Sequence, residues 1–149
     1  MTHTFVHSEG FTIIELLLSV AVMTILIGLS LPVYQTFVRS NDLDLNTQVV
    51  ADTMRRAETN ARGVNRDSVW GVYFTSTTTT LFKGATYATR DTSFDETTTL
   101  PNSVSQTGLT EITFSKMNAT PSTTGTLTLT STTNTTKQVT INAKGMVNY

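Results

Sequence analysis

Three stretches with different spacings of apolar residues follow one another along this chain. From Phe11 to Leu31 nearly every position is apolar, and Glu15 is the one charged residue. Between Leu43 and Val64 the apolar residues recur at three-, four- and seven-residue steps, as in a helix with one narrow apolar stripe. After Val69 the period becomes two, which is typical of strands. The pattern predicts a long helical segment followed by a β-rich region.

The segment Phe11–Leu31 is long enough for a bilayer, because a helix of this length spans about 31 Å at 1.5 Å per residue. We therefore expect a transmembrane helix here. A secretory signal peptide is disfavoured, because the apolar run is longer than an ordinary signal core and no small-x-small cleavage site follows it. A buried helix of a soluble protein is the remaining alternative, and it would have to hide apolar side chains on all sides.

Pro32 follows the apolar segment and is expected to kink or loosen the helix, because proline lacks a backbone donor. The amphipathic stretch after it would carry the helix into a globular head and end near Gly63. The predicted strands are Val69–Thr75, Thr80–Lys83, Phe94–Leu100, Leu109–Ser115, Thr126–Thr130, Gln138–Asn142 and Met146–Tyr149. An antiparallel sheet laid over the helix stripe gives an α+β fold.

Composition narrows the chemistry that the chain can carry. There is no cysteine, and the two histidines, His3 and His7, both lie in the first ten residues. Disulfides, thiolate metal sites, a cysteine nucleophile and a histidine centre in the body are thereby excluded. We expect no cofactor, no metal and no enzymatic activity.

Four arginines cluster near the end of the amphipathic stretch and form a candidate phosphate-binding patch. They are Arg55, Arg56, Arg62 and Arg66. Acidic Asp52, Glu58 and Asp67 are interleaved with them, and the net charge of the whole chain is -1. A solvated helix face with ion pairs one turn apart is therefore favoured, and a nucleic-acid partner is not expected.

Other polar groups carry weaker signals. Asp91, Asp95 and Glu96 lie in a loop-like stretch and could bind calcium, but their spacing fits no calcium-loop signature, so solvated turn residues are favoured. Asn118 and Asn134 match the N-glycan acceptor pattern, a short motif that many sequences contain by chance.

The string Gly10-Phe11-Thr12-Ile13-Ile14-Glu15-Leu16 resembles the processing site of type IV prepilins and type II secretion pseudopilins. In that family a short polar leader ends in Gly, Phe opens the mature chain, Glu is its fifth residue and a long apolar helix follows. Pro32 sits where many members carry a helix-kinking proline. The family leader usually holds Lys or Arg, and MTHTFVHSEG has neither. The head is more loosely similar to the H-type minor pseudopilins.

The resemblance implies a division into a leader (1–10), a transmembrane and assembly helix (11–31), an amphipathic helix half (32–64) and a β-rich head (65–149). A prepilin peptidase would cut after Gly10 and methylate the new amine of Phe11. The helix would serve first as an anchor in the lipid membrane and then as the core of a filament. Glu15 would pair with the Phe11 ammonium of a neighbouring subunit.

The implied location is the cytoplasmic (inner) membrane, with a single pass and the head outside the cytoplasm, and later a periplasmic or extracellular filament. The implied partners are the peptidase, other pilin or pseudopilin subunits and an inner-membrane assembly platform. Two further functions stay open: a minor tip subunit that captures DNA or export cargo, and a membrane-anchored protein outside filaments. The sequence leaves open whether the system serves a pilus, secretion or DNA uptake, and whether the subunit is major or minor.

Overall fold

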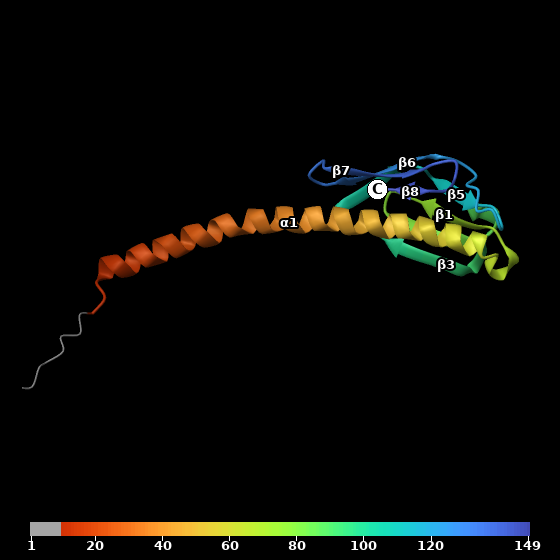
Figure 1. The fold of residues 1–149 in the computed structure, drawn as a ribbon. Coiled ribbons are helices and arrows are strands. Elements are labelled where there is room, and N and C mark those ends of the chain that lie inside the picture. Colours follow the sequence, from red (N-terminus) through yellow and green to blue (C-terminus); the bar gives the residue numbers. More distant parts are fainter. Residues whose placement is uncertain (1–9) are drawn as a thin grey trace, which may run out of the picture. The chain divides into compact units, whose positions relative to one another are not determined.

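The computed structural model describes residues 10–149, and the side chains at 29–33, 35, 36 and 39 lie outside the described set. The chain divides into two compact units, Met1–Phe37 and Val38–Tyr149. The helix α1 (Ile13–Arg62) begins in the first unit and ends in the second (Figure 1). All the strands belong to the second unit.

Within the second unit, α1 buries a narrow stripe of apolar side chains. Leu43, Val50, Met54, Ala57 and Ala61 are each at most 1% exposed. Along the last three positions of this stripe the side chain becomes smaller, from Met54 to Ala57 and Ala61. Small side chains let the strands approach the helix backbone closely. The predicted periodicity between 43 and 61 is thus confirmed by the burial of these side chains.

The C-terminal end of α1 is held by two backbone hydrogen bonds, one of which comes from the loop that contains Met117. The Gly63 N–H bonds the Thr59 carbonyl at 2.9 Å, and the Met117 N–H bonds the Ala61 carbonyl at 3.0 Å. Val64 then adopts a left-handed conformation with φ 51°, which is strained for a β-branched residue. This turn sends the chain through the short 3-10 helix η1 (Asn65–Asp67) into the first strand.

The first sheet contains four antiparallel strands in the order β3-β2-β1-β5. They are β1 (Trp70–Phe74), β2 (Thr78–Lys83), β3 (Asp91–Thr99) and β5 (Glu111–Phe114). The strand predicted at 69–75 corresponds to β1, which lies between β2 and β5 and is mostly buried.

The second sheet has the order β4-β6-β7-β8 and is also antiparallel. Its strands are β4 (Val104–Gly108), β6 (Gly125–Ser131), β7 (Thr136–Ile141) and β8 (Val147–Asn148). Leu127 and Leu129 of β6 face inward while threonines alternate with them, so the period of two is visible as a buried and a part-exposed face. β4 was not among the predicted strands.

A single hydrophobic core joins α1 to both sheets. It includes Met54 of α1, Val72 and Ile112 of the first sheet, and Leu127 and Val139 of the second. The two sheets are also joined by Gln106, which is 3% exposed. Its amide donates to the Thr78 carbonyl at 2.7 Å, and it exchanges a hydrogen bond with the buried Thr79 hydroxyl.

The face of the first sheet that points away from this core is covered by a loop. The 3-10 helix η2 (Tyr87–Thr89) places the Tyr87 ring edge-on to Phe82, at 5.6 Å between centroids. Phe82 is 0% exposed, and its ring fills the space above Gly71 on the neighbouring strand. A small aromatic layer therefore lies outside the main core.

The predicted fold class, one long helix with a transmembrane half packed on an antiparallel sheet, is wrong in this form. The packed part of α1 begins at Leu43, and its core is shared between two sheets instead of one. The alternation of residues fixed which positions face inward, but it could not show that the strands divide between two partners.

Among the residues that the structure describes, no helix combines the length and the apolar character needed to cross a bilayer. The predicted transmembrane helix and the single-pass location in the cytoplasmic membrane are therefore wrong.

Gly71→Ala should destabilise the second unit by about 1–3 kcal/mol, because overpacking forces strands apart. A Cβ there would lie 2.6 Å from the Phe82 ring and 2.7 Å from the Ile112 carbonyl oxygen. Chemical denaturation of the full chain measures the loss. Gly28→Ala is the control, because nothing lies within 4 Å of a Cβ at that position. Equal midpoints for Gly71→Ala and wild type would show that the aromatic layer yields freely.

Candidate functional site

The predicted cleavage point lies in non-helical chain just before α1. Gly10 is exposed, and Phe11 is 82% exposed. Gly10, Phe11, Thr12 and Glu15 line an open surface hollow of about 280 Å³. The Gly10–Phe11 bond is thus accessible, as a peptidase substrate must be.

Thr12 and Glu15 form the first turn of α1. The Glu15 N–H approaches the Thr12 hydroxyl at 3.4 Å, and the Leu16 N–H bonds the Thr12 carbonyl at 3.2 Å. A Thr followed three residues later by Glu is the sequence of a capping box. An acidic residue in the first turn also stabilises the helix, because its negative charge lies at the positive end of the helix dipole. The structure shows one half of such a box, the Thr12 hydroxyl that accepts the Glu15 N–H, and this capping by Thr12 was not predicted although the Thr-x-x-Glu spacing signals it.

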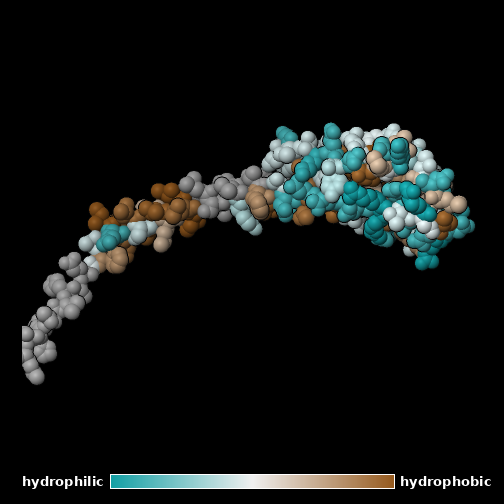
Figure 2. Space-filling view, viewed as in Figure 1, coloured by the Kyte–Doolittle hydropathy of each residue, from teal (hydrophilic) through white to brown (hydrophobic). Residues whose placement is uncertain are grey.

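The helix surface after this turn is apolar on every side and exposed. The exposed large side chains are Ile13, Ile14, Leu16, Leu17, Leu18, Val20, Val22, Met23, Ile25, Leu26 and Ile27. Figure 2 shows this part of the chain in brown, while teal and white predominate over the visible surface of the strands. We call Phe11–Gly28 the apolar segment. Such a continuous apolar surface marks an interaction site.

The hydroxyl side chains of Ser19 and Thr24, within the apolar segment, donate hydrogen bonds to backbone carbonyls of the same helix. The Ser19 hydroxyl donates to the carbonyls of Glu15 and Leu16 at 2.8 and 2.9 Å, and the Thr24 hydroxyl donates to the Val20 carbonyl at 2.8 Å. Glu15 is therefore the one charged group that this segment offers to a partner. Glu15 also lies four residues after Phe11, which precedes the first helical residue, Ile13. Pro32, the predicted bend, is among the residues whose side chains lie outside the described set.

Three of the four clustered arginines are ion-paired within the second unit. Arg56 donates twice to Glu96, at 2.7 and 2.9 Å, and Arg62 pairs with Glu58 at 2.6 Å. Arg55 pairs with Asp52 at 3.1 Å and also donates to the Val147 carbonyl.

The fourth arginine of the cluster, Arg66, lies over the Phe94 ring at 4.7 Å. Beyond the cluster, Lys116 pairs with Asp67 at 2.7 Å. The hydrogen bond and charge of this lysine lower the pKa of Asp67. Positive and negative groups thus alternate over this surface.

The three acids considered for calcium lie on β3 and face different cations. Asp91 meets Lys83 at 3.6 Å, Asp95 meets Arg90 at 2.8 Å, and Glu96 meets Arg56. The Ser93 backbone N–H is the main cause that lowers the pKa of Asp91. No group of three or more potential metal-ligating side chains occurs among the described residues.

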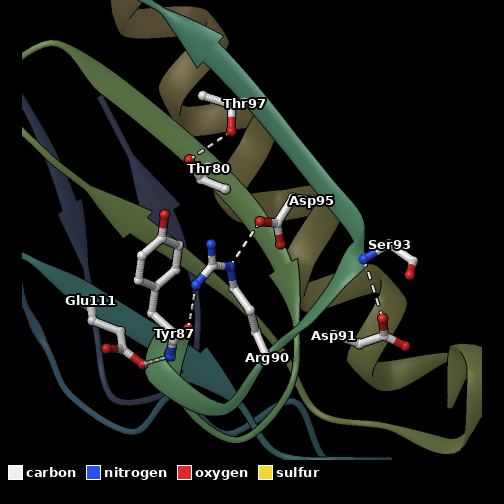
Figure 3. Close-up of polar contacts among 8 residues, drawn as sticks. All are labelled: Thr80, Tyr87, Arg90, Asp91, Ser93, Asp95, Thr97 and Glu111. Carbon is white, nitrogen blue, oxygen red and sulfur yellow. Dashed lines mark hydrogen bonds and ion pairs between the residues drawn. The ribbon is translucent and has the colours of Figure 1, made fainter.

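A second polar cluster was not predicted from the sequence. Arg90 lies 3.7 Å over the Tyr87 ring, which stacks on Tyr73 at 3.8 Å and 8°. Glu111 accepts the Tyr87 backbone N–H at 2.9 Å, and the hydrogen bond that Arg90 donates to Asp95 raises the pKa of Arg90 (Figure 3). These contacts hold η2 over the first sheet, so we interpret the cluster as one that stabilises the fold.

Comparisons with protein-family models, with curated proteins and with solved structures give no match to this chain. The likeness to prepilins and pseudopilins therefore rests on the residues from Gly10 onward.

We expect the full chain not to retard duplex DNA at moderate salt, because ion pairs neutralise most of the arginine cluster and phosphate binding needs released positive charge. Electrophoretic mobility measures this. A shift that Arg56→Ala and Arg62→Ala abolish, and that Lys144→Ala leaves unchanged, would contradict the interpretation and favour a DNA-capturing subunit.

Proposed function

We propose that this chain is a structural subunit of a type IV pilus-like or type II secretion filament, processed after Gly10 and polymerised through the apolar segment. The supporting observation is that the segment is an exposed helix with apolar side chains on every side, beginning directly after an accessible Gly10–Phe11 bond. Prepilin peptidase and other subunits of the same kind are its proposed partners.

Burial of this surface supplies the driving force. A large apolar side chain contributes about 1.5–3 kcal/mol when it is fully removed from water, so even partial burial of the segment exceeds the cost of association. The segment must meet a surface that is equally apolar and rod-like. A second copy of the same helix has these properties, and helix–helix packing brings such rods to within about 8–10 Å.

Glu15 gives the packing its axial register. Among other helices an unpaired carboxylate carries a large desolvation penalty, whereas a paired one carries much less. Cleavage after Gly10 creates a new ammonium at Phe11, and this group exists only in the processed chain. In a filament the Glu15 of one subunit meets the Phe11 ammonium of the next, and an offset subunit leaves both charges unpaired.

The position of Glu15 in the first turn of α1 is compatible with this pairing. Glu15 is N-terminal in α1, where its carboxylate favours the helix whether or not a partner is present. The interaction of the Glu15 carboxylate with the helix dipole therefore favours a helical segment before assembly. The intermolecular ion pair forms when subunits meet.

The mature protein should have a mass that lacks residues 1–10 and gains one methyl group. Intact-mass measurement of the protein from cells with an active prepilin peptidase checks this. Cells without the peptidase are the control, and they should yield the full chain. A full-length mass in both cell types would overturn the proposed processing.

Glu15→Ala should be processed normally but form at least about tenfold less filament than wild type, because one partner of a buried ion pair is left alone at a cost of several kcal/mol. Filament recovered by sedimentation measures assembly, and intact mass measures processing. Ser19→Ala is the matched control, since its hydroxyl bonds only its own helix. Wild-type amounts of Glu15→Ala filament would remove the register argument.

A further inference from the structure

The two sheets present four edge strands, and their edges differ sharply. A sheet edge offers a row of unpaired backbone N–H and C=O groups, which another strand can pair with. The first sheet ends in β3 and β5, and the second ends in β4 and β8.

The edge of β5 is closed by the chain that follows it. The Ser122 N–H donates to the Thr113 carbonyl at 2.8 Å, and the Thr113 N–H donates to the Ser122 hydroxyl at 3.1 Å. Pro121 forms a bridge with Phe114. Both outward groups of Thr113 are therefore used.

The edges of the second sheet are also occupied or short. In β4 the Gln106 N–H donates to the Ser76 carbonyl at 3.1 Å, and the Val104 N–H donates to the Pro101 carbonyl at 2.9 Å. β8 has only two residues, and Arg55 of α1 donates to its Val147 carbonyl at 3.2 Å. Neither edge can accept a long strand.

The edge of β3 is different. This strand has nine residues, most of them exposed. Among the described residues, its backbone makes one hydrogen bond outside the β2 ladder, from the Ser93 N–H to the Asp91 carboxylate at 3.2 Å. Its sequence, DTSFDETTT, contains no Pro and no Lys, two of the residues that commonly protect edges, and its unbroken pairing with β2 runs from Glu96 to Thr99, beyond a register shift between Leu81 and Lys83.

Charge on β3 is compensated from inside the protein. Its three acids pair with Lys83, Arg90 and Arg56, which lie on β2, beside η2 and on α1. Figure 3 shows Arg90 reaching Asp95 and Thr80 meeting Thr97 across the β2–β3 pair, at 3.0 Å between hydroxyls. The net charge along the β3 edge is therefore close to zero, and another strand that carries acidic residues could approach it with little repulsion.

We propose that two copies of this chain pair through β3, antiparallel, so that the first sheets of both copies become one continuous sheet. An incoming strand must itself have a free edge of several residues. Of the edges that the structure describes, β3 alone meets this requirement, so the partner of β3 is the β3 of a second copy. Such a pair has twofold symmetry and is closed.

Charge selects the register of the pair. Centring it on Asp95 or on Glu96 places identical carboxylates directly opposite each other, which is destabilising. Centring it on Thr97 places Thr97 opposite Thr97, Glu96 opposite Thr98, and Asp95 opposite Thr99. Thr–Thr pairs of this kind are favourable across strands. This contact is independent of the proposed filament, since it uses the second unit alone.

The absence of native cysteine allows a direct test by single-cysteine substitution in the full chain. In the Thr97-centred register, Thr97→Cys places two thiols on directly opposed residues, with Cα atoms about 4.5–5.5 Å apart and within disulfide reach. Thr99→Cys is the matched control on the same face of the same strand. Its two thiols would be separated by four residues, about 13 Å, which is beyond disulfide reach.

Under mild oxidation of dilute protein, Thr97→Cys should give at least about tenfold more disulfide dimer than Thr99→Cys on a non-reducing gel. Adding Glu15→Ala to both variants should leave this ratio unchanged, which separates the contact from assembly through the apolar segment. Equal linking of the two variants, or no dimer from Thr97→Cys, would overturn the proposed pairing. A ratio that falls to one with Glu15→Ala would assign the contact to filament packing and would also overturn it.

Discussion

The second unit depends on the burial of one narrow stripe of α1 between two sheets. The stripe ends in Ala57 and Ala61, whose side chains are too small to fill the core themselves. Large residues from the strands, such as Phe114 and Leu129, supply the volume instead. Because the helix stripe and the inner faces of both sheets share one core, the three elements stabilise one another, and none of them has a complete core alone.

The alternation of apolar residues with threonine predicted most of the strands because it reports directly which side chains face the core. β4 escaped prediction because its inward residues are Val104 and Gln106, and a buried glutamine is recognisable only through its hydrogen bonds to β2. The division into two sheets was not predicted for a related reason, since it depends on which elements lie next to each strand.

The candidate site shows the same limit more finely. Glu15 was found from a motif, and its capping partner Thr12 could have been found from the same seven residues. The ion pair of Arg56 with Glu96 joins residues far apart in the chain, so no sequence spacing announces it. It changes how the basic cluster is understood, because a charge that is compensated across the fold contributes little to attraction at a distance.

The inward-turned hydroxyls of Ser19 and Thr24 leave the apolar segment with one chemical landmark along its whole surface. The apolar side chains of such a surface determine how strongly a similar helix packs, and Glu15 determines its axial register. Neither feature distinguishes one such helix from another. If the proposed filament forms, selectivity among its subunits would then be encoded in the strand-bearing unit, and exchanging that unit, and not the helix, would change which subunits assemble together.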